Sequence, residues 1–315
     1  MIVRFSFDEL AAVLAATGIT RPFVIASGRW RSLDVPHELW WDEVPSHRVA
    51  VPGAADGILG IGGGSAIDTA KGASAASGLP LVSVPTTYAG AEWTTSFGIR
   101  SPDRRMQGGG AGAHPEGIVY DVELTLGLPP DVTAGTAMNA LAHTAEALYV
   151  RSRSDEGDAE ALAGAPLIAL ALPRVLADGG DRAARTELLT GAMHAGHALG
   201  LAGLGLAHAM AQAVGGRYGL PHGAMNALCL PPALEFNRRV VPDAVERFGE
   251  AIGGEPVART RELARLGGFE RLRDFGVPER DLGELAEAAA ARRGNEANPK
   301  RATPAEIRAL YESAW

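Results

Sequence analysis

The segment from Gly60 to Lys71, GIGGGSAIDTAK, constrains the fold of this chain more than any other part of it. The apolar run just before it, Gly57–Leu59, predicts a buried strand. The glycines that follow let the backbone turn sharply and approach a ligand closely. Ser65 is expected to cap a helix that carries Asp68. A strand, a glycine turn and a helix N-terminus together form an anion site, because the free N–H groups and the helix dipole point at one spot.

A pyrophosphate is the natural occupant of such a site, with contacts from Gly62, Gly63, Gly64 and Ser65. The pattern departs from the usual dinucleotide fingerprint, because Ser65 stands where G-x-G-x-x-G requires its last glycine. The alternative interpretation is that the glycines form only a tight turn between a strand and a helix.

Composition excludes several classes of partner. The chain has 315 residues, of which 46% are hydrophobic and 21% charged, as expected for about two globular domains. Its net charge of −8 argues against nucleic acid or an anionic membrane as the main partner. The first residues do not resemble a signal peptide, and no run approaches the roughly 18 apolar residues that cross a bilayer. A single cysteine, Cys229, fits a reducing cytoplasm. We therefore expect a cytoplasmic protein with a small-molecule substrate and no membrane partner.

The pattern of apolar residues changes near Pro129 and Pro130. Before this point, short β-type runs alternate with helical stretches, which favours a parallel sheet covered on both faces. Strands are predicted at 23–27, 47–51, 57–61 and 81–84. Helices are predicted at 134–150, 159–177, 186–214, 223–236, 256–267 and 304–313. We expect an α/β dinucleotide-binding domain at 1–129, an all-helical catalytic domain at 130–315, and a ligand in the cleft between them.

Histidines mark the second domain. His143 lies four residues after Asn139, so both share one face of a predicted helix. His208 lies on a second predicted helix, with His197 on a similar face, and His222 follows on a turn. Such imidazoles can converge as ligands for zinc or iron(II), or they can be hydrogen-bonded core residues. Asn139 makes a metal less favourable, since a neutral amide oxygen is a weaker ligand than a carboxylate.

Four motifs occur in order: Gly62–Lys71, Pro85–Glu92, Met138–Tyr149 and His208–Gly223. In this order and spacing they resemble the iron-containing alcohol dehydrogenase superfamily, and within it the maleylacetate reductase branch. The C-terminal stretch Asn298–Pro304 is also similar to that branch. The resemblance extends over most of residues 20–315. It implies a dehydroquinate synthase-like architecture and a homodimer, although the first domain of this chain is shorter than is typical of the family.

The resemblance also implies a cofactor, NADPH or NADH. Gly62 to Ser65 would hold its pyrophosphate, with Asp68 nearby, and Thr86, Thr87 and Tyr88 would line the nicotinamide and phosphate region. The metal positions of the family, for iron or zinc, fall on Asn139, His143, His208 and His222. The maleylacetate reductase branch commonly has asparagine at the first of these and is thought to work without metal. We therefore favour no tightly bound metal, and His143, His208, His222 and Tyr88 as the catalytic residues.

The chain departs from the family at its first domain. Gly62 comes only 35 positions after Ser27, which leaves less chain to cover the adenosine half of a cofactor. The acidic residue that would bind the ribose hydroxyls aligns near Gly28, so Arg29 or Arg31 could instead pair with a 2′-phosphate. This favours NADPH; the alternative is that both arginines are solvated surface charge.

Two further departures concern the substrate. Gln212 replaces a histidine that is usual in the family, and Ala209 replaces a lysine that is common in the branch. The loss of that lysine weakens maleylacetate, a dicarboxylate, as the substrate. The leading hypothesis is an NAD(P)H-dependent reductase that transfers hydride to a conjugated ketone or carbonyl in the interdomain cleft. The alternatives are a metal-dependent alcohol dehydrogenase, or a non-redox lyase, cyclase or isomerase with weakened cofactor binding.

Overall fold

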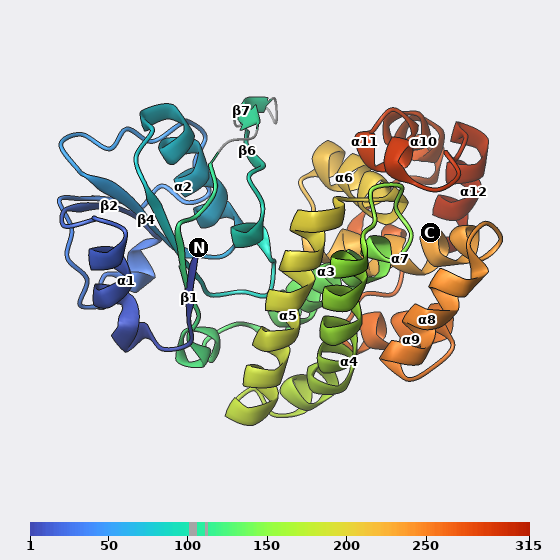
Figure 1. Cartoon of the computed structure of the whole chain (residues 1–315). Coiled ribbons are helices and arrows are strands. Elements are labelled where there is room, and N and C mark those ends of the chain that lie inside the picture. The colour runs from blue at the N-terminus through green and yellow to red at the C-terminus, as the bar shows by residue number, and fades with distance from the viewer. Residues whose placement is uncertain (101–105, 111–112) are drawn as a thin grey trace. The chain divides into compact units, whose positions relative to one another are not determined.

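The chain divides into two compact units, Met1–Thr125 and Leu126–Trp315, in the computed structural model. The structure describes residues 1–100, 106–110 and 113–315. Figure 1 colours the first unit from blue to green and the second from green to red.

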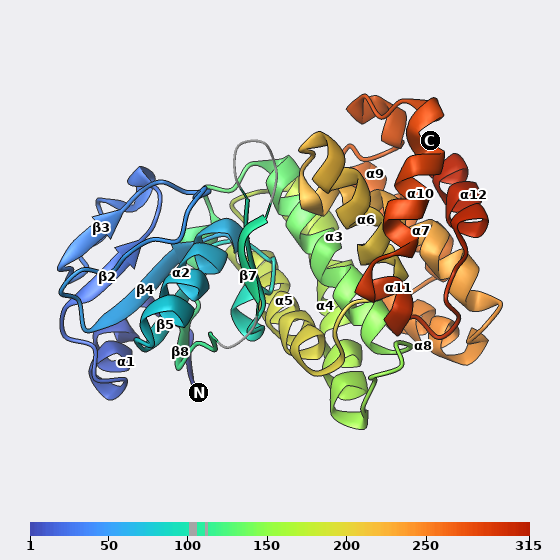
Figure 2. The same ribbon diagram turned by 90° about the horizontal axis from the view of Figure 1, so that it is seen from above.

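Unit 1 is built on a parallel sheet of six strands in the order β1-β8-β5-β4-β2-β3 (Figure 2). The strands are β1 (Ile2–Arg4), β2 (Pro22–Ile25), β3 (Leu39–Trp41), β4 (Gly57–Gly62), β5 (Leu81–Pro85) and β8 (Gly117–Val119). The central strands β2, β4 and β5 are buried along their whole length. Because every pair in this sheet is parallel, the carboxyl ends of these three strands lie at one edge.

Both faces of the sheet are covered. Helix α1 (Leu10–Ala16) packs with Val24, Leu59 and Val82 on one face. Helix α2 (Gly64–Ser77) packs with Ile58 and other residues on the opposite face. The remaining elements of unit 1 are the antiparallel pair β6 (Phe97–Arg100) and β7 (Met106–Gly110) and the 3₁₀ turns η1 (Phe7–Glu9), η2 (Gly28–Trp30), η3 (Ala91–Trp93) and η4 (Val122–Thr125). The expected parallel-sheet domain is confirmed.

The predicted strands were found at β2, β4 and β5, but the strand predicted at 47–51 is wrong. No strand forms in that fully described stretch, and β3 at 39–41 pairs with β2 instead. The indole N–H of Trp40 donates to the carbonyl of Ala26 at 2.9 Å, which secures β3 at the sheet edge. The edge strand β1 and its neighbour β8 have three residues each and are too short to show a periodic pattern.

Ser65 does not cap α2, contrary to expectation. The helix begins at Gly64, and its N-cap is Gly63, which has no side chain to accept a hydrogen bond. Ser65 lies in the first turn and is exposed. The first turn also contains no acidic residue. The N–H groups at this helix end are therefore not satisfied by a side-chain cap.

Unit 2 is all helical in its described residues. Its helices are α3 (Pro130–Ala147), α4 (Asp155–Ala177), α5 (Arg182–Ala202), α6 (Leu206–Tyr218), α7 (His222–Arg238), α8 (Pro242–Ile252), α9 (Pro256–Leu266), α10 (Leu282–Ala290), α11 (Arg293–Ala297) and α12 (Pro304–Ala314), with the 3₁₀ turns η5 (Leu272–Phe275) and η6 (Glu279–Asp281). Helix α3 is buried along most of its length and contacts α4, α5 and α7. A Cβ at Gly223 would lie 2.3 Å from the carbonyl carbon of Gly135, so only glycine permits this close approach of α7 to α3.

The single helix predicted at 186–214 is wrong, because the chain breaks into α5 and α6, which are bent by 100°. Gly203 in the break has a φ of 81°, a left-handed conformation that favours glycine. His197 and His208 therefore do not share a helix face. His197 lies on α5, where its Nδ1 is 3.2 Å from Glu160 of α4.

By length and composition alone, α4 is long and apolar enough to cross a membrane. The pair α5 and α6 passes the same test only if its bend of 100° is ignored. The buried core helix of a globular protein passes this test as well, and α4 packs against both α3 and α5. We assign no membrane span to it.

A buried lysine ties α2 to the loop after β5. The Lys71 ammonium is fully buried and lies 3.0 Å from an Asp68 carboxylate oxygen. It also donates to the Ala91 carbonyl at 2.9 Å, to the Thr94 hydroxyl at 3.1 Å and to the Ser96 carbonyl. These contacts satisfy the charge and hold the loop against the helix that follows the glycine turn.

We predict that Lys71→Met lowers the free energy of unfolding by about 3 kcal/mol, because it removes the cation that pairs with the buried Asp68 carboxylate and a charged donor to two carbonyls. Urea unfolding checks this. Lys300→Met is the control, since Lys300 is half exposed and pairs with Glu306 at the surface, and it is expected to change the midpoint little. Equal effects of the two substitutions would contradict the prediction.

Candidate functional site

Residues predicted to bind a cofactor gather at the carboxyl edge of the sheet in unit 1. Arg29 lies in η2 just after β2, Gly62 ends β4, and Thr86 follows β5. The Thr86 N–H donates to the Gly62 carbonyl at 2.9 Å, and Arg29 Nη2 lies 3.5 Å from the Thr86 hydroxyl. The carboxyl edge of a parallel sheet is where such folds bind ligands.

The glycine turn has the shape of a phosphate cradle. Gly62 has a φ of 149°, which residues with a Cβ rarely adopt. A Cβ at Gly63 would lie 3.0 Å from the Thr87 methyl group, so a side chain there would crowd the turn. Together with the uncapped N-terminus of α2, this leaves backbone N–H groups and the positive helix end available to an anion. The residues present fit the pyrophosphate of a dinucleotide.

The other predicted residues of unit 1 are placed differently. The Asp68 carboxylate is bound by Lys71 and by the Gly98 N–H at 3.2 Å, so the protein itself uses its oxygens. Tyr88 is fully buried. Arg31 pairs with Asp42 at 3.1 Å, whereas no carboxylate in the described residues pairs with Arg29.

The histidines of unit 2 come together from three helices. Asn139 and His143 lie on α3, His208 on α6 and His222 at the start of α7. The rings of His143 and His208 stack with centroids 4.7 Å apart, and those of His208 and His222 are 5.8 Å apart. His143 and His208 are buried, whereas His222 is exposed.

Glu146 is a member of this cluster that the sequence interpretation did not select. One carboxylate oxygen accepts from His208 Nδ1 and from the Gly205 N–H, both at 2.7 Å, and the other accepts from the His208 N–H at 3.2 Å. Glu146 therefore caps α6, whose N-cap is a glycine, and also orients the His208 ring. Its position seven residues after Asn139 on α3 was a usable signal, because that spacing returns to the same helix face.

Asn226 is the second residue that the sequence interpretation missed. Its side-chain nitrogen lies 2.7 Å from Asn139 Oδ1, 3.0 Å from His222 Nε2 and 3.2 Å from the His222 carbonyl. Asn139 Oδ1 also lies 3.1 Å from His208 Nε2. A continuous hydrogen-bond chain thus runs from Glu146 through His208, Asn139 and Asn226 to His222.

Two polar atoms of the cluster are buried without a partner in the described residues: His143 Nδ1 and Asn226 Oδ1. Burial, and then the neighbouring rings of His208 and His222, hold the pKa of His143 well below its ordinary value. His143 is therefore neutral near pH 7. A neutral imidazole with an unused nitrogen is suited to hydrogen-bond a ligand.

Comparison with known proteins places this geometry in a family. A model described as "Fe-containing alcohol dehydrogenase family, C-terminal" matches residues 133–315, and one described as "Iron-containing alcohol dehydrogenase" matches residues 47–122. The chain belongs to the iron-containing alcohol dehydrogenase family. Maleylacetate reductase 1 of Rhodococcus opacus is 35% identical over 263 residues, which are 83% of this chain and 73% of that protein. Maleylacetate reductase of Burkholderia cepacia is 36% identical over 263 residues, 83% of this chain and 74% of that protein.

A solved structure supports the same assignment. Maleylacetate reductase from Agrobacterium tumefaciens superimposes with a TM-score of 0.90 at 28% identity, covering all of this chain and 95% of its own. The predicted membership of the maleylacetate reductase branch is confirmed, as is the prediction of an oxidoreductase. Membership implies a nicotinamide cofactor, and the metal-dependent and non-redox alternatives are not favoured.

The family is named for iron, but the cluster as arranged does not fit a metal ion. The Asn226 amide N–H group lies between Asn139 Oδ1 and His222 Nε2, two of the atoms that would have to coordinate the cation. A hydrogen-bond donor at that place repels a cation. In the part of the chain that the structure describes, no group of three His, Cys, Asp or Glu side chains is arranged to hold a metal.

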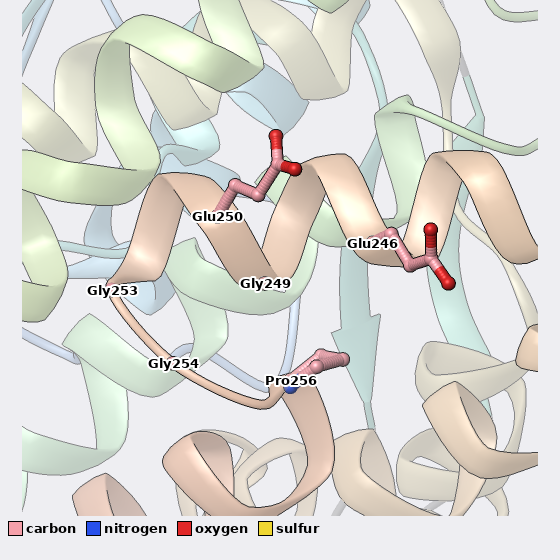
Figure 3. A pocket seen from close by; sticks show the side chains of 6 residues that line it. All are labelled: Glu246, Gly249, Glu250, Gly253, Gly254 and Pro256. Carbon is pink, nitrogen blue, oxygen red and sulfur yellow. The ribbon is translucent and has the colours of Figure 1, made fainter.

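A surface hollow in unit 2 is a weaker candidate for the active site than the histidine cluster. It has a volume of about 530 Å³ and lies where α8 leads into α9 (Figure 3). Its lining residues are Glu246, Gly249, Glu250, Gly253, Gly254 and Pro256. The two carboxylates in this lining come with no imidazole, hydroxyl or cationic side chain that could act on a carbonyl compound.

We predict that Glu146→Gln destabilises the protein by about 2 kcal/mol, because a glutamine amide presents only one oxygen to three N–H donors. Urea unfolding measures the change. The matched control is Glu187→Gln, at an exposed carboxylate that pairs with Arg174 at 2.7 Å, for which we expect no significant shift of the midpoint. A neutral effect of Glu146→Gln would show that Glu146 is not the cap of α6.

Proposed function

We propose that this chain is an NAD(P)H-dependent reductase of the maleylacetate reductase type, acting on a conjugated ketone or other carbonyl compound. The observation that carries the proposal is the hydrogen-bonded cluster of His143, His208 and His222 with two buried polar atoms left unpaired. Unpaired buried polar atoms are rare in folded proteins, and here they are the groups that a substrate oxygen or hydroxyl would engage.

Unit 1 holds the cofactor in this proposal. Gly62, Gly63, Gly64 and Ser65 bind the pyrophosphate through backbone N–H groups and the N-terminus of α2. Thr86, Thr87 and Tyr88 line the region of the nicotinamide and its phosphate. When bound, the reduced nicotinamide supplies the hydride. Asp68 acts indirectly, since its carboxylate is held by Lys71 and supports the turn of α2.

The cofactor is NADPH in this proposal. Arg29 follows β2 and has no carboxylate partner in the described residues, so its guanidinium can pair with a 2′-phosphate. Arg31 is less suited, because Asp42 already neutralises it. No helix longer than the turn η2 separates β2 from β4 in this fully described stretch, which leaves Arg29 near the surface.

The histidines act on the substrate carbonyl. Hydride addition builds negative charge on the carbonyl oxygen, or on the enolate oxygen of a conjugated ketone, and that charge requires hydrogen-bond donors. His222 is exposed and is the imidazole that a substrate arriving from solvent meets first. His143 offers a neutral ring that can hydrogen-bond to the substrate without adding a positive charge to the cluster. Tyr88 remains a proposed catalytic residue of unit 1.

A cation contacts α6 one turn beyond His208, although the lysine expected in this branch is Ala209. Arg292 donates to the Gln212 side chain at 3.3 Å and to the Gln212 carbonyl at 3.1 Å. Gln212 lies one helical turn beyond His208 on α6. A guanidinium at this place supports a substrate with a carboxylate group. The proposal also keeps a cytoplasmic location and a homodimer, from the single cysteine and the family.

We predict that the metal-stripped protein binds NADPH with micromolar affinity and retains its reductase activity in the presence of a chelator, because neither the glycine turn nor the hydrogen-bonded histidines require a cation. Calorimetric titration with NADPH and NADH, together with metal analysis, checks this. Failure of the folded protein to bind either nucleotide would overturn the proposed function. Recovery of activity only on adding iron or zinc would overturn the metal-free mechanism.

We predict that Arg29→Ala weakens NADPH binding about tenfold, roughly 1.4 kcal/mol, while NADH binding stays unchanged, because only NADPH has the 2′-phosphate. The control is Arg31→Ala, which removes a guanidinium already paired with Asp42 and should leave both affinities unchanged. Equal losses for both nucleotides would show that Arg29 does not read the phosphate.

A further inference from the structure

Asn226 lies in the second turn of α7, is fully buried and is surrounded by groups that accept hydrogen bonds. One of its three neighbours, the His222 carbonyl oxygen, can only accept. The end of the Asn226 amide that faces this carbonyl must therefore be the NH₂ group. This settles the orientation of the amide on chemical grounds.

The orientation of Asn226 determines the orientation of Asn139. The Asn226 NH₂ group lies 2.7 Å from the Asn139 amide, so Asn139 must present its oxygen there. That oxygen also faces His208 Nε2 at 3.1 Å, so Nε2 carries a hydrogen; because Nδ1 donates to the Glu146 carboxylate at 2.7 Å, both ring nitrogens of His208 carry one. Asn226 thus determines which atoms donate and which accept at two residues of the cluster.

The same NH₂ group determines the tautomer of His222. The two hydrogens of the Asn226 NH₂ group serve three acceptors, so His222 Nε2 at 3.0 Å shares one of them with the His222 carbonyl at 3.2 Å. A second N–H at Nε2 would oppose this donor, so Nε2 must offer its lone pair. In a neutral imidazole the hydrogen is then on Nδ1. His222 is the first residue of α7, at a helix end where side chains are exposed, and Asn226 binds it from one turn further along the same helix.

We propose that Asn226 is a positioning residue that fixes the ring orientation and the Nδ1–H tautomer of His222 and holds Asn139 with its oxygen toward His208. Through its hydrogen bond to Asn139, Asn226 also links α7 to α3. The effect on catalysis rests on the proposed function, whereas the effect on the His222 tautomer does not.

The Nδ1–H tautomer has a consequence for the reaction. With Nε2 bound to Asn226, Nδ1 is the nitrogen through which His222 can donate to the oxygen of a carbonyl substrate. If Asn226 were unable to donate, the ring could turn or change tautomer and the donor would be misplaced. A catalytic group that is misplaced by about 1 Å slows the chemical step far more than it weakens the affinity for substrate.

The first test uses the unmodified protein. Nitrogen-15 NMR of the histidine rings, at a pH of about 8 where a typical histidine is neutral, distinguishes the two tautomers. His222→Gln assigns the His222 signals by their loss. We expect a lone-pair signal from Nε2 and a protonated signal from Nδ1. A protonated Nε2 in the neutral ring would overturn the proposal, whether or not any substrate has been identified.

The second test compares two isosteric substitutions on α7. Asn226→Asp keeps the shape but replaces the donor by an acceptor. Asn237→Asp is the matched control, because Asn237 is equally buried and pairs with Asn298 at 3.1 and 2.8 Å without contacting a histidine in the described structure. Both variants are studied with a chelator present, so that the new carboxylate recruits no metal.

With NADPH and maleylacetate as the probe substrates, we expect Asn226→Asp to lower kcat about tenfold or more, with the KM for NADPH unchanged within about twofold. The His222 signals should change to a protonated Nε2. Asn237→Asp should lower stability but leave kcat and the tautomer unchanged. An unaltered tautomer in Asn226→Asp, or an equal loss of kcat in both variants, would overturn the positioning role. If the unmodified protein reduces no maleylacetate, the kinetic part fails with the proposed function, and the tautomer measurement still decides the role of Asn226.

Discussion

The hydrogen-bond chain from Glu146 to His222 is the constraint on which the arrangement of unit 2 depends. It joins α3, α6 and α7 through buried polar groups, each of which would be costly to leave unpaired. Glu146 has two structural roles, because the carboxylate that caps α6 also orients the His208 ring. The stability of the helix start and the geometry of the site therefore depend on the same atoms.

Unit 1 depends on a different constraint, the alignment of parallel strands. Strands β2, β4 and β5 end at one edge, and the segments that follow them carry Arg29, the glycine turn and Thr86. The buried ammonium of Lys71 binds the loop after β5 and holds it against α2, the helix that follows the turn. The stretch between β2 and β4 is short and contains no helix longer than η2 in these described residues.

Much of this fold was predictable because its signals are local. Continuous apolar runs located β2, β4 and β5, and long alanine-rich segments located the helices of unit 2. The failures have physical reasons. The segment 47–51 has a strand-like composition, but Leu39–Trp41 takes the edge position beside β2. The stretch 186–214 looks like one helix, but Gly203 has a left-handed backbone conformation and ends α5. Ser65 was expected to cap α2, but the N-cap is Gly63 and the helix starts two residues earlier than expected.

The sequence by itself determined the family, the glycine turn, and the three histidines with Asn139. These depend on residue types at fixed spacings along one segment, and a spacing of four on a helix determines which side chains share a face. Only the tertiary structure decided that Glu146 and Asn226 complete the site. Their roles depend on hydrogen bonds between helices. The bonded residues are 62 positions apart for Glu146 and His208, and 87 positions apart for Asn139 and Asn226. The folded chain decides which acceptor lies beside which donor when the two are so far apart in sequence. A local sequence pattern therefore cannot predict these hydrogen bonds.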